Sequence, residues 1–209
     1  LKLRVLRSFH YRVRRTNGLS AKLQREGKTR WLDMGASSSF SDNFFFADLY
    51  PKSEAKPELK DRYFQFNAAS ELSDEELEPM GKFDLIRMQH VFEHIVFEDG
   101  AKALFNCHRL LNDEGYLLIA VQDLASMVER YRRICLNVSW EFKDWAESRI
   151  EIGDPQTYYV SVFSHSVPFQ THLWCYDTDG LSHALERTGL FKNIQCITGY
   201  HPLAEIPFT

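Results

Sequence analysis

The chain reads Phe83-Asp-Leu-Ile-Arg-Met88 near its middle and Tyr116-Leu-Leu-Ile-Ala-Val121 further on. Continuous apolar runs of this kind predict strands that are buried on both faces of a sheet. Between the two runs, one face of a predicted helix carries Ala101, Leu104, Phe105, His108 and Leu111. We expect residues 112–115, which end in Gly115, to close that helix. A strand, a helix and a second strand in this order predict a parallel α/β sheet.

The same alternation continues on both sides of this unit. Upstream, short apolar runs predict three more strands, at residues 30–34, 44–48 and 63–67. Downstream, a second helical face ends at Gly189, and residues 193–197 predict a last strand. The apolar positions of that second helix are Leu181, Ala184, Leu185 and Thr188.

Length and composition fit one globular domain with additions. The chain has 209 residues, of which 44% are apolar and 26% are charged, so it is too apolar to be disordered. We divide it into a basic N-terminal segment at 1–28 and a domain at 29–209, with an aromatic-rich insert at about 125–172. Residues 1–30 carry ten Lys and Arg against one acid, Glu26. This basic head predicts contact with an acidic partner or, alternatively, a solvated helix docked on the acidic body.

The sequence also bears on location. It has no apolar run long enough to cross a bilayer, and the first 15 residues lack the apolar region of a secretory leader. The four cysteines form no CxxC pair, which argues against a zinc ribbon, a thioredoxin-type motif and a disulfide scaffold. We therefore expect a cytoplasmic protein with reduced thiols.

Two features at the ends of predicted strands point to a nucleoside ligand. The first strand ends in Asp33-Met-Gly35 and continues with small residues, whose backbone N–H groups can approach a ligand closely. The second strand ends at Asp48, whose carboxylate can accept hydrogen bonds from both hydroxyls of a ribose. Because ligands of open α/β sheets bind beyond the carboxyl ends of the strands, the two features predict one site.

The central block resembles class I S-adenosylmethionine-dependent methyltransferases. The similarity lies in Phe83-Asp-Leu-Ile, in His90-Val-Phe-Glu-His94, and in Arg109-Leu-Leu-Asn-Asp-Glu-Gly115 before the next strand. It is closest to the small methyltransferase-like proteins of cell-surface polysaccharide gene clusters, whose tail is similar to residues 172–191. The resemblance implies S-adenosylmethionine as cofactor. It also implies a Rossmann-like, mostly parallel sheet of about six to seven strands, with the insert after the fifth strand.

The resemblance further implies which residues surround the cofactor. They are Asp33, Gly35, Ala36, Ser37, Asp48, Leu49, Asn67, Ala68 and Gln89. The first four would form the turn around the methionine part, and Asp48 would hold the ribose. The three residues that follow Asp48 in this set would lie beside the adenine. Gln89 would face the sulfonium together with His90, and Asp123 would point into the acceptor pocket.

Methyl transfer from a sulfonium is an in-line displacement at carbon, so the protein chiefly positions and desolvates the reactants. An oxygen acceptor also needs a base to take its proton. The candidates are His90, Asp123 and His172, and a histidine suits this role at neutral pH. The sequence does not rank the three.

His90-Val-Phe-Glu93-His94 also matches the H-x-x-E-H pattern of zinc proteases. On a helix, His90 and His94 would share a face and could bind zinc. His90 follows a buried strand directly, so we assign no metal ligand here. One alternative stays open, because small-RNA 2′-O-methyltransferases are similar at this place. That resemblance implies that Glu93 and His94, with His165 or His172, hold a divalent ion.

These observations predict a methyltransferase of polysaccharide biosynthesis, whose acceptor is a hydroxyl of a saccharide or similar small polar molecule. Aromatic side chains of the insert could stack on a sugar face. A catalytically inactive binding module in a glycan-assembly protein is one alternative, because Gly35-Ala-Ser37 replaces the usual Gly-x-Gly. An RNA methyltransferase is another, because the head is basic. The oligomeric state is not predicted.

Overall fold

The computed structural model describes residues 19–35, 44–50, 57–121, 123–125, 128 and 172–195. Its strands are β1 (Trp31–Met34), β2 (Phe44–Asp48), β3 (Tyr63–Gln65), β4 (Phe83–Gln89) and β5 (Leu111–Ala120). Its α-helices are α1 (Leu19–Arg25), α2 (Asp74–Leu77), α3 (Phe97–Leu110) and α7 (Thr178–Thr188). Three short 3₁₀ helices connect them: η2 (Pro57–Arg62), η3 (Glu78–Met80) and η4 (Phe92–His94).

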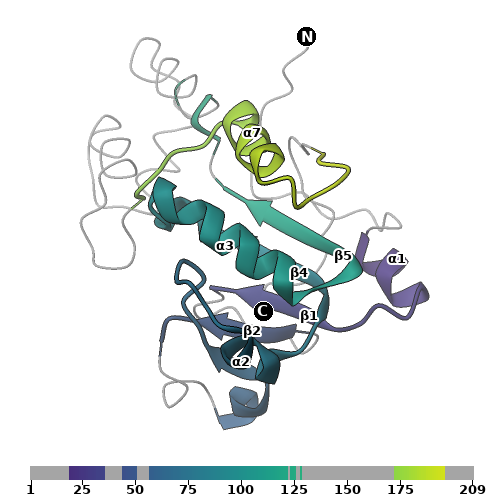
Figure 1. Ribbon diagram of the computed structural model, residues 1–209. Helices are drawn as coiled ribbons and strands as arrows, with labels where there is room; N and C mark the ends of the chain where they lie inside the picture. The colour runs from purple at the N-terminus through teal and green to yellow at the C-terminus, as the bar shows by residue number, and fades with distance from the viewer. Residues whose placement is uncertain are drawn as a thin grey trace, which may run out of the picture.

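The five strands form one parallel sheet in the order β3-β2-β1-β4-β5 (Figure 1). The order reverses between β1 and β4, which is the switch point at which open α/β sheets bind ligands. The predicted fold class is thereby confirmed, and the five predicted strands through residue 121 are all present. Residues 193–195, where a last strand was expected, carry no strand. Most of the insert predicted at about 125–172 lies outside the described residues.

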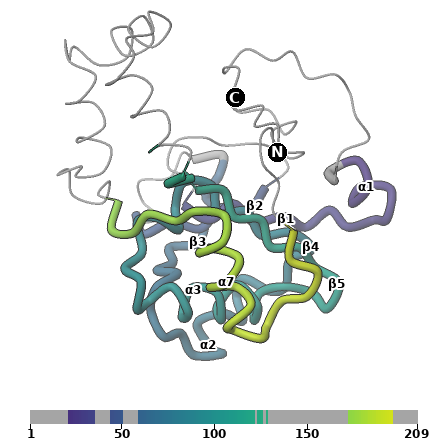
Figure 2. The backbone as a smooth tube through the Cα atoms, turned by 90° about the horizontal axis from the view of Figure 1, so that it is seen from above, coloured from purple at the N-terminus to yellow at the C-terminus, as the bar shows by residue number. Residues whose placement is uncertain are grey.

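The two faces of the sheet are covered differently. Because side chains alternate along a strand, Leu32 and Met34 of β1 point to the face covered by α3, while Trp31 and Asp33 point to the other. On that other face, Leu23 of α1 is fully buried with the aromatic side chains of β2. Figure 2 shows α3 and α7 together on one side and α1 apart from them.

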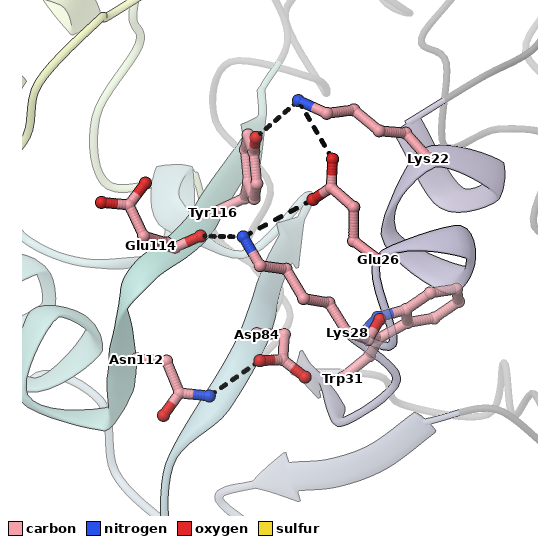
Figure 3. Close-up of polar contacts among 8 residues, drawn as sticks. All are labelled: Lys22, Glu26, Lys28, Trp31, Asp84, Asn112, Glu114 and Tyr116. Carbon is pink, nitrogen blue, oxygen red and sulfur yellow. Dashed lines mark hydrogen bonds and ion pairs between the residues drawn. The ribbon is translucent and has the colours of Figure 1, made fainter.

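α1 is attached to the sheet by lysines that belong to the predicted basic head (Figure 3). Lys22 Nζ lies 3.0 Å from the Tyr116 hydroxyl of β5, and Lys28 Nζ donates to the Glu114 carbonyl at 3.1 Å. Glu26 carries a carboxylate near both ammonium groups, at 3.9 and 3.6 Å. Within the part of the head that the structure describes, these charges therefore fasten the helix to β5.

The buried face predicted for α3 is wrong by about one residue of rotation. The apolar side chains that α3 buries are Ala103, Leu104, Cys107 and Leu110, whereas Phe105 is 50% exposed. Two overlapping apolar stripes share Leu104, and packing against β4 and α7 selects one of them. Residues 112–115 belong to β5 and do not close the helix. By contrast, α7 ends as predicted at Gly189, which adopts a left-handed conformation with φ 65°.

A buried ion pair links the two central strands. Arg87 of β4 is the register partner of Asp33 of β1, and its Nε donates to Asp33 Oδ1 at 2.9 Å, with a second contact from Nη2 to Oδ2. The guanidinium also lies over the Phe44 ring of β2, 4.6 Å from the centroid. Both side chains are about 5% exposed or less, so removing one of them would leave the charge of the other buried and unpaired.

Arg87→Met is therefore expected to lower the free energy of unfolding by about 3–5 kcal/mol, because it strands the Asp33 carboxylate in the core. The double change Asp33→Leu/Arg87→Met should recover most of that loss, since the two buried charges then disappear together. Urea unfolding followed by circular dichroism measures both. Lys102→Met is the control, because the Lys102–Asp99 pair lies on the surface of α3 and should cost under about 1 kcal/mol. A small effect of Arg87→Met, close to that of the control, would contradict this account.

Candidate functional site

The predicted site residues that the structure describes lie mainly at the carboxyl ends of the parallel strands. Gly35 follows β1, Asp48 ends β2, and Gln89 ends β4. Asp123 lies just beyond β5. Ala36 and Ser37 fall outside the described residues. In a parallel sheet these strand ends share one edge, so the sheet itself gathers the predicted residues.

Gly35 makes the closest approach at this edge. Its φ of 71° is in the left-handed region, and its N–H donates to the Ala47 carbonyl at 2.7 Å. A Cβ at this position would lie 3.0 Å from Cγ1 of Val91 and still nearer to Cγ2. Glycine is thus required both by its conformation and by the segment that follows β4. The turn after β1 and the end of β4 are in direct contact.

Asp33 lies inside the sheet layer. Burial raises the pKa of its carboxyl, and the Arg87 guanidinium that donates to it offsets part of that rise. The predicted role of Asp33 beside the methionine part of the cofactor stays a prediction. Arg87 was not singled out from the sequence. The sequence feature that could have pointed to it is a single cation within one apolar strand together with a single acid within the neighbouring strand.

Asp48 and the residues after it form the second part of the site. The Asp48 Oδ1 accepts a hydrogen bond from the Leu49 N–H at 2.7 Å, which fixes the carboxylate at the strand end. Leu49 is 48% exposed, and Tyr50 is 45% exposed. Two exposed apolar side chains beyond β2 are available to cover a flat aromatic base.

The turn after β3 is held by a residue that the sequence did not single out. Asn106 of α3 is buried, and its Nδ2 donates to the carbonyls of Ala68 and Ser70 at 2.9 and 2.8 Å. Asn67 is exposed, and its side-chain oxygen accepts from the Ala69 N–H at 3.1 Å. The predicted adenine-side residues, Asn67 and Ala68, therefore sit on a turn that α3 fixes in place.

His90 has an unusual conformation directly after β4. Its φ is 53°, and its N–H donates to the Ala120 carbonyl of β5 at 2.9 Å. Its side chain is 53% exposed, and Nδ1 lies 3.0 Å from Oε1 of the buried Glu93. A left-handed non-glycine residue at the end of a central strand is commonly a functional position.

A segment distant in sequence completes this region. The N–H groups of Leu173 and Trp174 both donate to the Glu93 carbonyl, at 2.8 and 3.2 Å. Tyr176 pairs with Asp123 in an isolated parallel bridge, and its ring lies 5.2 Å from that of Phe92. Residues 172–176 are therefore fastened to η4 and to the end of β5.

This docking brings His172 to His94, with ring centroids 4.9 Å apart. Of the three predicted proton acceptors, His90 and His172 thus both lie beside residues of η4, and Asp123 pairs with Tyr176 of the segment that carries His172. Burial raises the pKa of the Tyr176 hydroxyl to about 12, so this group stays protonated at neutral pH. Burial also raises the pKa of the Cys175 thiol, and the Glu93 carboxylate raises it further.

The helical arrangement required by the zinc-protease pattern is not formed. η4 begins at Phe92, so His90 precedes it and does not share a helical face with His94. One of the two ligand sets that the sequence left open does come together, namely Glu93, His94 and His172, with ligand atoms within 4.8 Å of one another. His165, which belongs to the other set, lies outside the described residues.

No helix in the described part of the chain is long and apolar enough to span a membrane.

Comparison with known proteins gives one family match. A family model described as a methyltransferase domain matches residues 9–195. Among solved structures, PKMT2 from Rickettsia typhi is similar, at 14% identity and a TM-score of 0.40. That match covers 77% of this chain and 38% of the PKMT2 chain, so this chain spans well under half of that protein. None of the curated proteins matches the chain. The family match includes all five strands and α7.

Gly35→Ala is expected to destabilise the fold more than an alanine at another left-handed glycine. A left-handed alanine costs about 1–2 kcal/mol by itself, and at position 35 the contact with Val91 adds to it. Gly27→Ala is the matched control, because Gly27 has φ 73° and nothing within 4 Å of its Cβ position. Thermal unfolding measures the difference. Adding Val91→Ala should bring Gly35→Ala close to the control, and a persisting gap would show that Val91 is not the obstacle.

Proposed function

Because the chain belongs to the methyltransferase domain family, whose methyl donor is S-adenosylmethionine, we propose that it methylates a hydroxyl of a saccharide or a similar small polar acceptor. The chain is, by this membership, an S-adenosylmethionine-dependent methyltransferase domain. The acceptor and the roles of individual residues are the inferred part. One observation supports the placement of the donor: Gly35 and Asp48 end the neighbouring strands β1 and β2, next to the point where the order of the sheet reverses.

These residues fit an adenosyl group. Gly35 and Asp48 end neighbouring parallel strands at the edge of the sheet where ligands of open α/β sheets bind, and Asp48 offers a carboxylate to a ribose. Leu49 and the turn at Asn67 and Ala68 follow the next two strands in the order of the sheet, on the side expected for the adenine. We assign Asp33, Gly35, Ala36, Ser37 and Gln89 to the methionine side.

The donor supplies, when bound, a methyl group that is already activated by its sulfonium. The protein must hold the acceptor oxygen in line with the methyl carbon and accept the proton of the hydroxyl. The C–O bond forms as the C–S bond breaks, and the electron pair of the C–S bond leaves with sulfur. We infer that His90 is the best placed of the three candidate bases. It directly follows β4, it is half exposed, and the buried Glu93 orients its ring.

Exposed aromatic side chains support a saccharide acceptor. Phe97 at the start of α3 and Trp174 on the docked segment lie 4.6 Å apart between ring centroids, and they are 44% and 43% exposed. Both are adjacent to η4, because Trp174 donates its N–H to the Glu93 carbonyl. Aromatic faces stack on the apolar faces of sugar rings. The polysaccharide role proposed from the sequence is consistent with such a surface.

Calorimetric titration with S-adenosylmethionine and S-adenosylhomocysteine tests the donor site. We expect Asp48→Asn to weaken binding at least about tenfold, because it removes charge-assisted hydrogen bonds to the ribose. Asp113→Asn is the control, since Asp113 is exposed near the amino end of β5, away from the site. Equal binding by both variants would overturn the role of Asp48.

The acceptor is tested by following S-adenosylhomocysteine release with a panel of saccharides and nucleotide sugars. His90→Ala is expected to lower turnover about 10²–10⁴-fold while donor binding is kept. The control is His183→Ala, because His183 lies exposed on α7. Methylation of RNA or of a protein instead of the saccharides would overturn the acceptor class and leave the donor site standing. Donor binding without turnover on any acceptor would favour a non-catalytic binding module.

A further inference from the structure

Glu93 is a buried acid, and only one of its two carboxylate oxygens has a described hydrogen-bond partner. The residue is 2% exposed, and its Oε1 lies 3.0 Å from His90 Nδ1. Its Oε2 is buried and has no hydrogen-bond partner among the residues that the structure describes. A buried carboxylate oxygen without a partner is costly, so such a group calls for a cation or a donor.

Two imidazoles lie beside this carboxylate. One ligand atom each from Glu93, His94 and His172 can be chosen such that all three lie within 4.8 Å of one another. Both histidines are partly buried, so the cluster remains open to solvent on one side. Three ligands around a metal at about 2.1 Å bond length lie somewhat closer together than this, and small rotations of the two imidazole rings would close the set.

The backbone already holds the three residues in place. Glu93 and His94 are consecutive in η4, and His172 precedes the two N–H groups that bind the Glu93 carbonyl. The contact between Phe92 and Tyr176 anchors the same two segments a second time. A site whose ligands come from two fastened segments needs little ordering when it binds an ion.

We propose that Glu93, His94 and His172 bind a divalent transition-metal ion of the zinc type. Two imidazole nitrogens and one carboxylate oxygen favour zinc and its neighbours over magnesium or calcium, which prefer oxygen ligands. Three protein ligands leave a fourth position for water, as in open zinc sites. The hydrogen bond between His90 and the other Glu93 oxygen would fix the orientation of the ligating carboxylate.

This site goes beyond the proposed function, because binding the ion needs neither the methyl donor nor an acceptor. It also differs from the zinc-protease pattern of the sequence. That pattern pairs His90 with His94, whereas here the second imidazole comes from His172, almost eighty positions further along the chain than His94. Only the docking of residues 172–176 on η4 brings it there.

The test is calorimetric titration of the EDTA-treated full chain with ZnCl₂, together with the visible absorption of bound Co²⁺. We expect a zinc site with micromolar or tighter affinity. Glu93→Gln, His94→Ala and His172→Ala should each weaken it by more than the roughly 10–100-fold that the loss of an outer hydrogen-bonding partner costs. Zinc should raise the melting temperature of the wild type and should have little effect on that of the three variants.

Two controls separate loss of ligand from loss of fold. His183→Ala and Glu186→Gln change the same residue types at exposed positions of α7, and they should bind zinc like the wild type. Far-UV circular dichroism and S-adenosylmethionine binding of each variant report on the fold and on the donor site separately from the metal. Wild-type zinc affinity in the three ligand variants, or no zinc binding by the wild-type chain, would overturn the proposal whatever the outcome for the donor.

Discussion

The ion pair between Asp33 and Arg87 joins the two strands at which the order of the sheet reverses. The pair is buried in the sheet. Asp33 and Arg87 are opposite each other in the register of β1 and β4, and the next residues, Met34 and Met88, are opposite each other too. Two residues after Asp33 comes Gly35, and four residues after Arg87 comes Val91, and these meet at the edge of the sheet. The close turn that we assign to the donor site therefore lies directly beyond this buried charge pair.

A second constraint shapes the region around η4, to which we assign the acceptor. The carbonyl of Glu93 accepts two backbone hydrogen bonds from the segment that begins at His172, and the Phe92 ring packs against Tyr176. These contacts join η4 to residues 173–176, a segment that follows the insert. The exposed aromatic pair and the cluster of imidazoles both lie at this junction. Binding of an acceptor and binding of an ion would thus act on the same short piece of structure.

Several lysines and arginines that the structure describes contact groups of the sheet or of its connections. Lys22 of α1 and Lys28, which follows the helix, donate to the Tyr116 hydroxyl and the Glu114 carbonyl of β5. Arg30 lies over the rings of Phe45 and Phe83 at 4.2 and 4.9 Å. Arg109 spans from the Leu72 carbonyl to the Asp74 carboxylate. These cations hold the edges of the sheet and its connections together. The described lysines of the basic head are thus consistent with the docked-helix alternative. For the other residues of the head, contact with an acidic partner stays a prediction.

The five strands, the parallel sheet, the end of α7 at Gly189, and the positions of Gly35 and Asp48 at strand ends could all be predicted from the amino-acid sequence. Each follows from local patterns, namely apolar runs, helical spacing and the conformational freedom of glycine. Other features are set by packing in three dimensions. They are the apolar stripe of α3 that is buried, the pairing of Arg87 with Asp33, the hold of Asn106 on the turn at Ala68, and the approach of His172 to Glu93. Those features join residues far apart in the chain, and their energy comes from burial and pairing that no local pattern encodes.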